Sequence, residues 1–162
     1  MSADLLYSET EQDLRASVRR LLSERAGADT VVTAYDDVSA DFTGLWKSLA
    51  SELGLAGLLV PEELGGAGAS TREAAVVMEE IGRAVAPVPF FTSAVLATTA
   101  LLKAGETEVL GQLAAGDSTA ALVVPLSTAP GTFTPTVKAT ASGLVGSVTT
   151  VAGVAESDVL VV

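Results

Sequence analysis

The stretch that decides the fold runs from Leu53 to Ser70 and reads LGLAGLLVPEELGGAGAS. It consists of an apolar run, a proline, two acidic residues and a turn rich in glycine. Pro61 fixes its own φ and disfavours helical geometry at Val60, so the apolar run must end there. The glycines that follow supply the backbone freedom that a tight reversal requires. We therefore expect a sharp corner between two helices.

The residues after this corner predict a helix. Residues 70–73, STRE, have the S/T-x-x-E pattern of a capping box, which marks a helix N-terminus. Apolar residues then recur at steps of three and four up to Gly82: Ala74, Val77, Met78 and Ile81. This spacing places them on one face of the helix, which we expect to be buried.

The residues before the corner predict two more helices. Residues 8–11, SETE, form another capping box, and the helix that they open ends at Gly27. A second apolar stripe ends at Gly54, a residue typical of a C-cap. It consists of Phe42, Leu45, Trp46, Leu49 and Leu53. Between the two helices, residues 30–40 are polar and acidic, and we expect them to form a connector.

Two further helices are expected before residue 117. The first runs from about Thr92 to Lys103 and is mostly apolar, which predicts a buried helix ending near Gly105. The second is short, with Thr107 as its N-cap and Gly116 as its stop signal.

Residues 84–102 carry no charged side chain and are long enough in principle to cross a bilayer. Pro87 and Pro89 interrupt the first third of this stretch, and several threonines lower its apolarity. We therefore interpret it as a buried helix entered through a proline-containing connector, and expect no membrane span. The N-terminus lacks the basic and apolar regions of a signal peptide, so we expect a cytoplasmic protein.

The character of the sequence changes after Asp117. Four short segments rich in β-branched residues predict strands: ALVVP, TFTPTVKAT, LVGSVTTV and DVLVV. Gly131 and Gly143 mark turns, and residues 155–158 are typical of a loop. We therefore expect an α+β fold, with an all-α domain over residues 1–116 and the beginning of a β-barrel or sandwich domain over residues 117–162. Because four short strands leave a sheet open, we expect a part of a longer chain, or one that relies on another polypeptide.

Composition excludes several classes of function. The 162 residues include no cysteine and no histidine, which excludes disulfides, Ser-His chemistry and the usual zinc ligands. We predict no metal site. The net charge of -11 would repel a phosphate backbone, so nucleic acid is not an expected partner. An apolar content of 49% is enough for a sizeable core.

Together these features resemble the N-terminal helical domain of the acyl-CoA dehydrogenase family. In that family a Gly-Leu run, a V-P-E-E segment and a G-G-x-G turn stand in the order found over residues 53–70, and residues 73–102 are similar to the next two helices. The resemblance implies α,β-dehydrogenation of an acyl-CoA thioester, in which a carboxylate removes the α-proton while a hydride leaves for FAD. It also implies a dimer or tetramer, and electron-transfer flavoprotein or a similar electron acceptor.

The resemblance places the catalytic glutamate in a C-terminal helical bundle that is absent here, so we assign no catalytic residue. Four glutamates of this chain are interpreted as solvated or capping carboxylates: Glu62, Glu63, Glu79 and Glu80. In the family, the helix that begins near Thr92 helps to line the acyl pocket. The residues that this implies as pocket lining are Phe91, Ala94, Val95 and Thr98, with ordinary core packing as the alternative.

The sequence departs from the family at the flavin site. Where the family has a T-E-P-x-A-G-S-D run, residues 125–131 read PLSTAPG, and the family's Trp-Ile-Thr flavin contact falls on residues 150–152, Thr-Val-Ala. We therefore assign no FAD-binding residue. Two hypotheses stay open: a subunit that works with FAD, as a homo-oligomer or with a partner, and a flavin-deficient partner subunit of a heteromeric enzyme. A third is an acidic helical interaction module without CoA chemistry.

The glycine turn at residues 65–68 also has two interpretations. A glycine-rich loop before a helix can bind an anion such as a CoA phosphate. No lysine follows it, and its spacing is not that of a phosphate loop, so we favour a simple turn.

Overall fold

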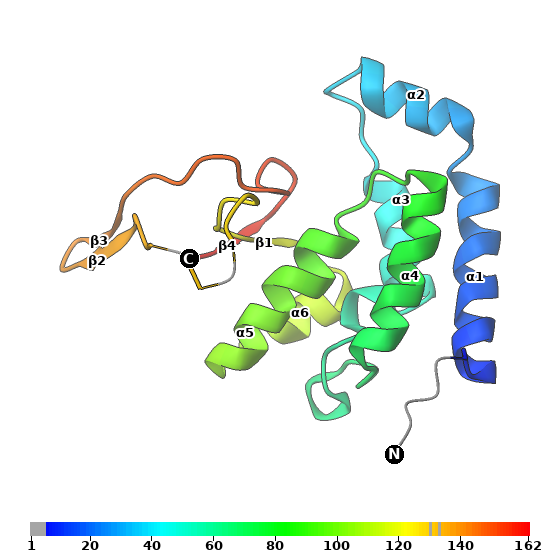
Figure 1. The fold of residues 1–162 in the computed structure, drawn as a ribbon, viewed down its shortest axis with the longest axis horizontal. Helices are drawn as coiled ribbons and strands as arrows, with labels where there is room; N and C mark the ends of the chain where they lie inside the picture. The colour runs from blue at the N-terminus through cyan, green and yellow to red at the C-terminus, as the bar shows by residue number, and fades with distance from the viewer. Residues whose placement is uncertain (1–5, 130, 133) are drawn as a thin grey trace.

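The computed structural model describes residues 6–129, 131–132 and 134–162, and it confirms the α+β fold. Helices occupy the first part of the chain and short strands the last part (Figure 1). Within the described residues, no helix combines the length and the apolarity needed to cross a membrane.

Helices α1 (Glu9–Arg25) and α4 (Thr71–Ala84) pack side by side, and α1 lies at the edge of the bundle away from the strands (Figure 1). Both begin with the predicted capping box. The Oγ of Ser8 accepts a hydrogen bond from the backbone N of Glu11 at 3.2 Å, and the Glu11 carboxylate accepts one from the Ser8 N. Ser70 and Glu73 repeat this arrangement at α4. Each box satisfies backbone donors that the first helical turn leaves without partners.

The prediction of a connector over residues 30–40 is wrong for most of its length. Helix α2 (Ala28–Asp36) occupies it and begins just after Gly27. None of its residues is buried, and it lies beyond the C-terminal ends of α1 and α4 in Figure 1. Only Thr30, Val31 and Ala34 are partly covered, so α2 lacks the wide buried apolar stripe that indicates a core helix.

Helix α3 (Thr43–Lys47) continues into the π-helical segment η1 (Ser48–Glu52), as the apolar stripe predicted. Gly54 follows with a φ of 68°, a left-handed conformation in which glycine has no Cβ to clash. The chain then enters the predicted corner.

The corner contains two short 3₁₀ turns, η2 (Leu55–Gly57) and η3 (Glu62–Leu64). Backbone N–H groups of the glycine turn donate hydrogen bonds to the apolar run that precedes Pro61. The N of Ala67 donates to the carbonyl of Gly57 at 3.0 Å, and the N of Gly68 donates to the carbonyl of Val60 at 2.8 Å. These donors are therefore not available to an anion. The simple turn is confirmed, and the phosphate-binding interpretation is wrong.

The buried helix expected from Thr92 begins slightly earlier and has two parts. The π-helical segment η4 (Phe90–Ala97) runs directly into α5 (Thr98–Ala104), which ends at Gly105 with a φ of 73°. The Thr98 hydroxyl donates to the carbonyl of Ser93, five residues back, at 2.9 Å.

Helix α6 (Leu110–Ala115) begins later than predicted, because Val109 and not Thr107 precedes it. The Glu106 carboxylate accepts a hydrogen bond from the backbone N of Glu108 at 2.7 Å. This local bond stabilises a non-helical turn before the helix, since a side-chain acceptor offers the backbone an alternative to helical bonding. Gly116 ends the helix as predicted.

Two apolar clusters hold these elements together. The first joins α1, α4, the α3–η1 helix and the start of η4, and its fully buried members include Val18, Leu49, Val77 and Phe90. The second joins the corner, η4, α5 and α6 to the first strand, through Val60, Ala97, Leu110, Leu113 and Ala120. The first strand is thus part of the helical core.

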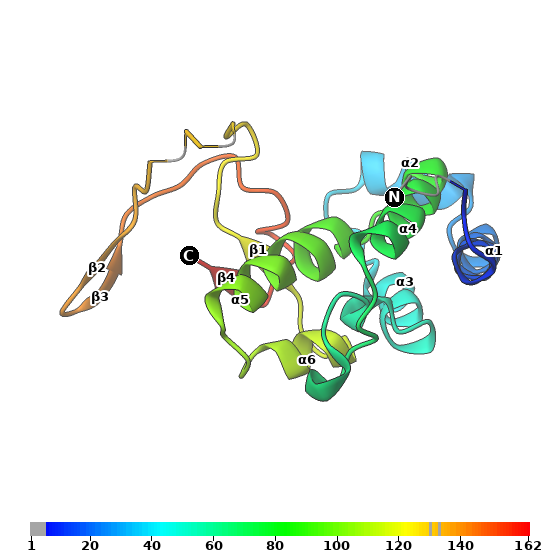
Figure 2. The same cartoon turned by 60° about the horizontal axis from the view of Figure 1, so that its bottom comes forward.

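Four strands form two separate sheets. Strand β1 (Ala120–Leu122) pairs in parallel with β4 (Val159–Val161), in a register that places Ala120 beside Val159. Strands β2 (Lys138–Thr140) and β3 (Gly143–Val145) form an antiparallel hairpin, all of whose residues are exposed. In Figures 1 and 2 this hairpin projects away from the helices.

Candidate functional site

The four predicted pocket residues lie on one helix but differ in exposure. Ala94 and Thr98 are buried in the core, at 2% and 0% exposure. Val95 is partly buried against the first apolar cluster, and Phe91 is 38% exposed. The lining of the acyl pocket stays a prediction, in which Phe91 and Val95 are the side chains with surface to offer.

Segment η4 also joins the helices to the strands, a role that sequence reasoning missed. The buried Ser93 Oγ accepts a hydrogen bond from the backbone N of Ala120 at 3.0 Å. At Gly153 a Cβ would lie 2.7 Å from the Cβ of Thr92, so the loop before β4 passes against η4. A lone serine in an apolar helix gives no signal in sequence that it is bound to a strand.

A second polar junction fixes the start of β1 to the start of β4. The Asp158 carboxylate accepts hydrogen bonds from the backbone N of Thr119 at 2.8 Å and from its hydroxyl at 3.1 Å. The same hydroxyl lies 2.9 Å from the carbonyl of Glu156. Residues 155–158 form a loop, as predicted, and this loop is held by Thr119.

The segments that correspond to the family's flavin contacts lie side by side. Pro125 and Val151 form an isolated antiparallel bridge, and the backbone N of Leu126 donates to the carbonyl of Thr150 at 3.1 Å. The hydroxyl of Thr150 donates to the carbonyl of its neighbour Thr149 at 2.6 Å. Pro130, within the same run, lies outside the described residues.

One large cavity of the described structure has a volume of about 840 Å³. Four separate segments line it, over residues 34–47, 86–89, 116–119 and 155–158. Its charged lining residues are Asp37, Asp41, Lys47, Asp117, Glu156 and Asp158. Five carboxylates therefore face one ammonium group, and the predicted acyl-pocket residues are not part of this wall.

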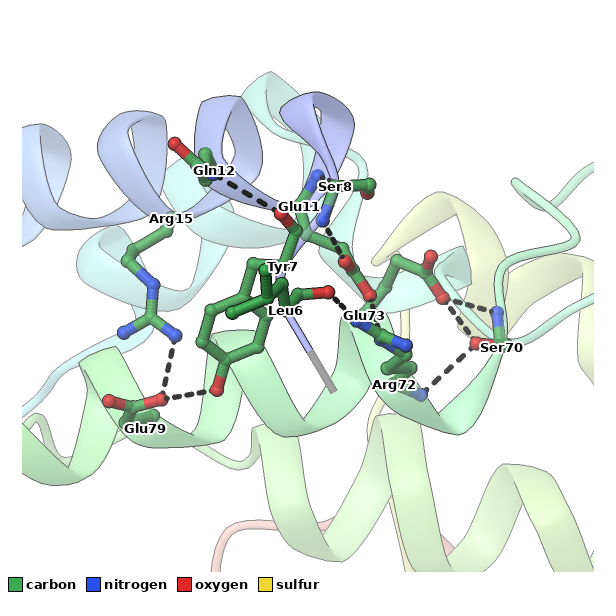
Figure 3. Close-up of polar contacts among 10 residues, drawn as sticks. All are labelled: Leu6, Tyr7, Ser8, Glu11, Gln12, Arg15, Ser70, Arg72, Glu73 and Glu79. Atoms are coloured by element: carbon green, nitrogen blue, oxygen red, sulfur yellow. Dashed lines mark hydrogen bonds and ion pairs between the residues drawn. The ribbon is translucent and has the colours of Figure 1, made fainter. Parts of the chain in front are cut away.

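The seam between α1 and α4 is a network of ion pairs. Figure 3 shows Arg15 between the ring of Tyr7, 4.5 Å away, and the carboxylate of Glu79, 2.8 Å away. At the same end Arg72 pairs with Glu11 and donates to the carbonyl of Leu6.

The centre of this seam corrects the interpretation of Glu80 as a solvated carboxylate. Its side chain is 1% exposed, and both oxygens accept hydrogen bonds from Arg19, at 2.6 and 2.8 Å. Arg15 and Arg83 also pair with it, at 3.2 and 3.4 Å. Glu62, Glu63 and Glu79 are exposed, as predicted. Sequence alone gives no signal for this difference, because two of the three partners of Glu80, Arg19 and Arg15, lie 61 and 65 residues away.

These contacts predict how stability depends on pH. The hydrogen bonds from Arg19 hold the pKa of Glu80 below its ordinary value of 4.5, and those from Arg15 do the same for the pKa of Glu79. A lowered pKa in the folded state means that the unfolded chain binds protons first, so this stabilisation is complete above pH 4.5 and is lost as the pH falls below it. Urea unfolding from about pH 7 to about pH 3 should show this loss.

A matched pair of variants isolates the contribution of Glu80 to this pH dependence. In Glu80→Gln the loss between pH 4.5 and the folded-state pKa should be smaller than in the natural chain. Glu63→Gln changes an exposed glutamate of the corner and should leave the pH profile unchanged. Equal profiles for Glu80→Gln and the natural chain would contradict the assignment.

Comparison with known proteins identifies the class to which this architecture belongs. The sequence model of the acyl-CoA dehydrogenase N-terminal domain matches residues 8–117. Over 109 residues the chain is 40% identical to the acyl-CoA dehydrogenase IpdE2 of Mycolicibacterium smegmatis. The matched region covers 67% of this chain and 35% of IpdE2.

Two solved structures share the fold. A variant of the Tcur3481-Tcur3483 steroid ACAD has a TM-score of 0.68 at 26% identity, covering 80% of this chain and 36% of that chain. The ChsE4-ChsE5 complex from Mycobacterium tuberculosis has a TM-score of 0.67 at 24% identity, and the match covers 79% of this chain and 36% of that chain. At this identity the similarity is one of fold.

The helical bundle, its proline-glycine corner and these matches define an acyl-CoA dehydrogenase N-terminal domain. The chain therefore belongs to the acyl-CoA dehydrogenase family. It spans about a third of the length of the curated relatives that it matches.

Proposed function

We propose that the chain is the N-terminal part of an acyl-CoA dehydrogenase subunit that acts with FAD in the α,β-dehydrogenation of an acyl-CoA thioester. The observation that carries this proposal is the family match over residues 8–117, which spans the helical bundle and its corner. The division into a helical domain of residues 1–116 and a β segment of residues 117–162 is part of the proposal, as is a dimer or tetramer that passes electrons to electron-transfer flavoprotein or a similar acceptor.

A bulky acyl group such as a steroid side chain is the substrate class that we propose. The support is the solved relative at 26% identity, which is described as a steroid ACAD. Phe91, Ala94, Val95 and Thr98 would form the wall that this chain gives to the acyl pocket. Since Ala94 and Thr98 are buried, the contact surface would come from Phe91 and Val95.

The described residues do not fit a flavin ring. FAD supplies the hydride acceptor in this family's chemistry, and its ring needs a flat partner and a hydrogen-bond donor. At the two segments that correspond to the family's flavin contacts, no described residue of 125–129 or 150–152 is aromatic. The Thr150 hydroxyl is already bonded to its neighbour's carbonyl. We therefore derive no step of the reaction at this segment.

This misfit favours a second candidate function, a flavin-deficient partner subunit in a heteromeric acyl-CoA dehydrogenase. The FAD and the catalytic carboxylate would then come from the other subunit. The solved steroid ACAD supports such an assembly, because its name joins two proteins, Tcur3481 and Tcur3483.

An absorbance spectrum tests both candidates. We expect the purified chain to be colourless, and the complex with its partner subunit to bind FAD and to lose flavin absorbance when an acyl-CoA is added. A purified chain that is yellow with bound FAD would contradict the second candidate and leave the first. A complex that neither binds FAD nor is stabilised against heat by an acyl-CoA would contradict both, and would favour a module without CoA chemistry.

A further inference from the structure

The ion pairs of this chain are distributed unevenly. Five arginines pair with carboxylates on or near α1, on the side of the bundle away from the strands: Arg15, Arg19, Arg25, Arg72 and Arg83. In contrast, within the part of the chain that the structure describes, none of the five carboxylates lining the large cavity forms an ion pair. Among the described residues that line the cavity, Lys47 is the one cationic side chain, so most of the negative charge there is not balanced by the lining.

The cavity carboxylates come from separate segments of the chain. Hydrogen bonds from Ser39 and Thr43 lower the pKa of Asp37 and Asp41, respectively, which keeps both ionised. Among the described residues, no three acidic groups converge closely enough to hold a metal ion. Negative charge distributed along a cavity of this kind suits several separate cations better than one ion.

An apolar groove of about 400 Å³ continues from the cavity. The two share Ala34, Ala86 and Pro87 in their walls. Tyr35 of α2, which is 90% exposed, and Val85 at the end of α4, which is 64% exposed, both line the groove. Val85 also has a φ of 49°, a strained conformation for a β-branched residue. Exposed apolar side chains gathered around a groove are typical of an interaction site.

We propose that the acidic cavity and the apolar groove together bind a segment of a different polypeptide, one that carries Lys or Arg side chains beside an apolar side chain. Charge complementarity selects this occupant, because the cavity presents five carboxylates and one lysine. A second copy of this chain is a poor occupant, since its net charge is -11 and five of its arginines are already paired. The inference rests on the proposed function in one respect, that the partner subunit of the enzyme supplies the segment.

Trp46 provides the measurement, because it is the chain's only tryptophan and it lines the cavity. The probe is a short synthetic amphipathic helix with Lys on one face and Leu on the other, without tryptophan. We expect it to change the Trp46 fluorescence with a saturable binding curve. A control peptide with the same composition in scrambled order has no apolar face, and it should bind about tenfold more weakly.

Matched variants of the chain locate the binding site. Asp117 and Glu156 are exposed, and their side chains make no hydrogen bond in the described structure, so Asp117→Asn/Glu156→Gln removes two charges without breaking a contact. We expect this variant to bind the peptide about tenfold more weakly than the natural chain, and Tyr35→Ser to lower the affinity by the same factor. The control Asp13→Asn/Glu24→Gln makes the same chemical change on the exposed surface of α1 and should bind like the natural chain. Leu126→Ser is the apolar control.

Three results would overturn the proposal: no binding, equal weakening by the cavity and control variants, or spermine binding at the cavity as tightly as the peptide, which would indicate a small polycation. The outcome is separable from that of the proposed function. If the peptide does not bind but the flavin complex assembles, the docking surface is wrong and the function stands. If the peptide binds at the cavity but no FAD-containing complex forms, the surface stands and the function is wrong.

Discussion

Replacing Glu80 with glutamine should lower the free energy of unfolding by about 2 kcal/mol at neutral pH. The carboxylate is 1% exposed and pairs with three arginines from two helices, so its removal leaves their charges next to a neutral amide. Arg15 is 16% exposed and keeps a desolvation penalty after the change, whereas Arg19 and Arg83, at 45% and 61% exposure, are rehydrated by water. Equilibrium unfolding in urea, followed by circular dichroism, measures the loss.

Glu79 provides the control for this prediction, since it is the neighbouring residue on the same helix and also pairs with Arg15. Its side chain is 55% exposed, and water replaces the lost contact in Glu79→Gln. We expect this change to have a small fraction of the effect of Glu80→Gln. If the two variants are equally stable, the seam is not organised around Glu80.

The contrast between these two glutamates shows where sequence reasoning stops. Both were interpreted as solvated. Adjacent residues on a helix differ by about 100° in direction, so Glu80 is buried against α1, whereas Glu79 lies at the edge of the seam, half in water. Which of them faces α1 depends on how two helices separated by about 60 residues are rotated against each other. Local spacing does not contain that information.

Features encoded within a few residues were predicted well. The capping boxes at Ser8 and Ser70 and the helix end at Gly116 are where the sequence placed them, because each depends on one or two side chains and the local backbone. Helix α2 was missed for the opposite reason. None of its nine residues is buried, and the few that are partly covered do not make the wide apolar face that predicts a helix.

The candidate site was predicted only in part, since its polar parts come from distant segments. The helix that carries Phe91 and Val95 was found from its apolarity, but that property does not separate a pocket wall from a core. The bond from Ala120 to Ser93 and the acidic cavity join residues from opposite ends of the chain. Such groupings need the fold before they can be recognised.

Replacing Gly66 with alanine should cost about 3 kcal/mol of stability, because the corner leaves no room for a side chain there. A Cβ at this position would lie 2.1 Å from the carbonyl oxygen of Val60 and 2.6 Å from that of Gly57. Both contacts are with backbone, which cannot move aside as a flexible side chain could. The carbonyls of Gly57 and Val60 also accept the hydrogen bonds that hold the corner closed, so a shift to relieve the clash would break these bonds.

Two other glycines separate this steric effect from backbone strain. A Cβ at Gly65 would touch nothing within 4 Å, but its φ is 87°, so Gly65→Ala should cost about 1 kcal/mol from conformation alone. At Gly111, within α6, there is free space and an ordinary helical backbone, and Gly111→Ala should raise the stability by up to about 1 kcal/mol. Urea unfolding should therefore rank the stabilities Gly111→Ala, the natural chain, Gly65→Ala and Gly66→Ala in descending order. A Gly66→Ala chain as stable as the Gly65→Ala chain would show that the corner can open, and the close approach of Gly66 to Val60 would then not be what fixes the angle between the helices on either side.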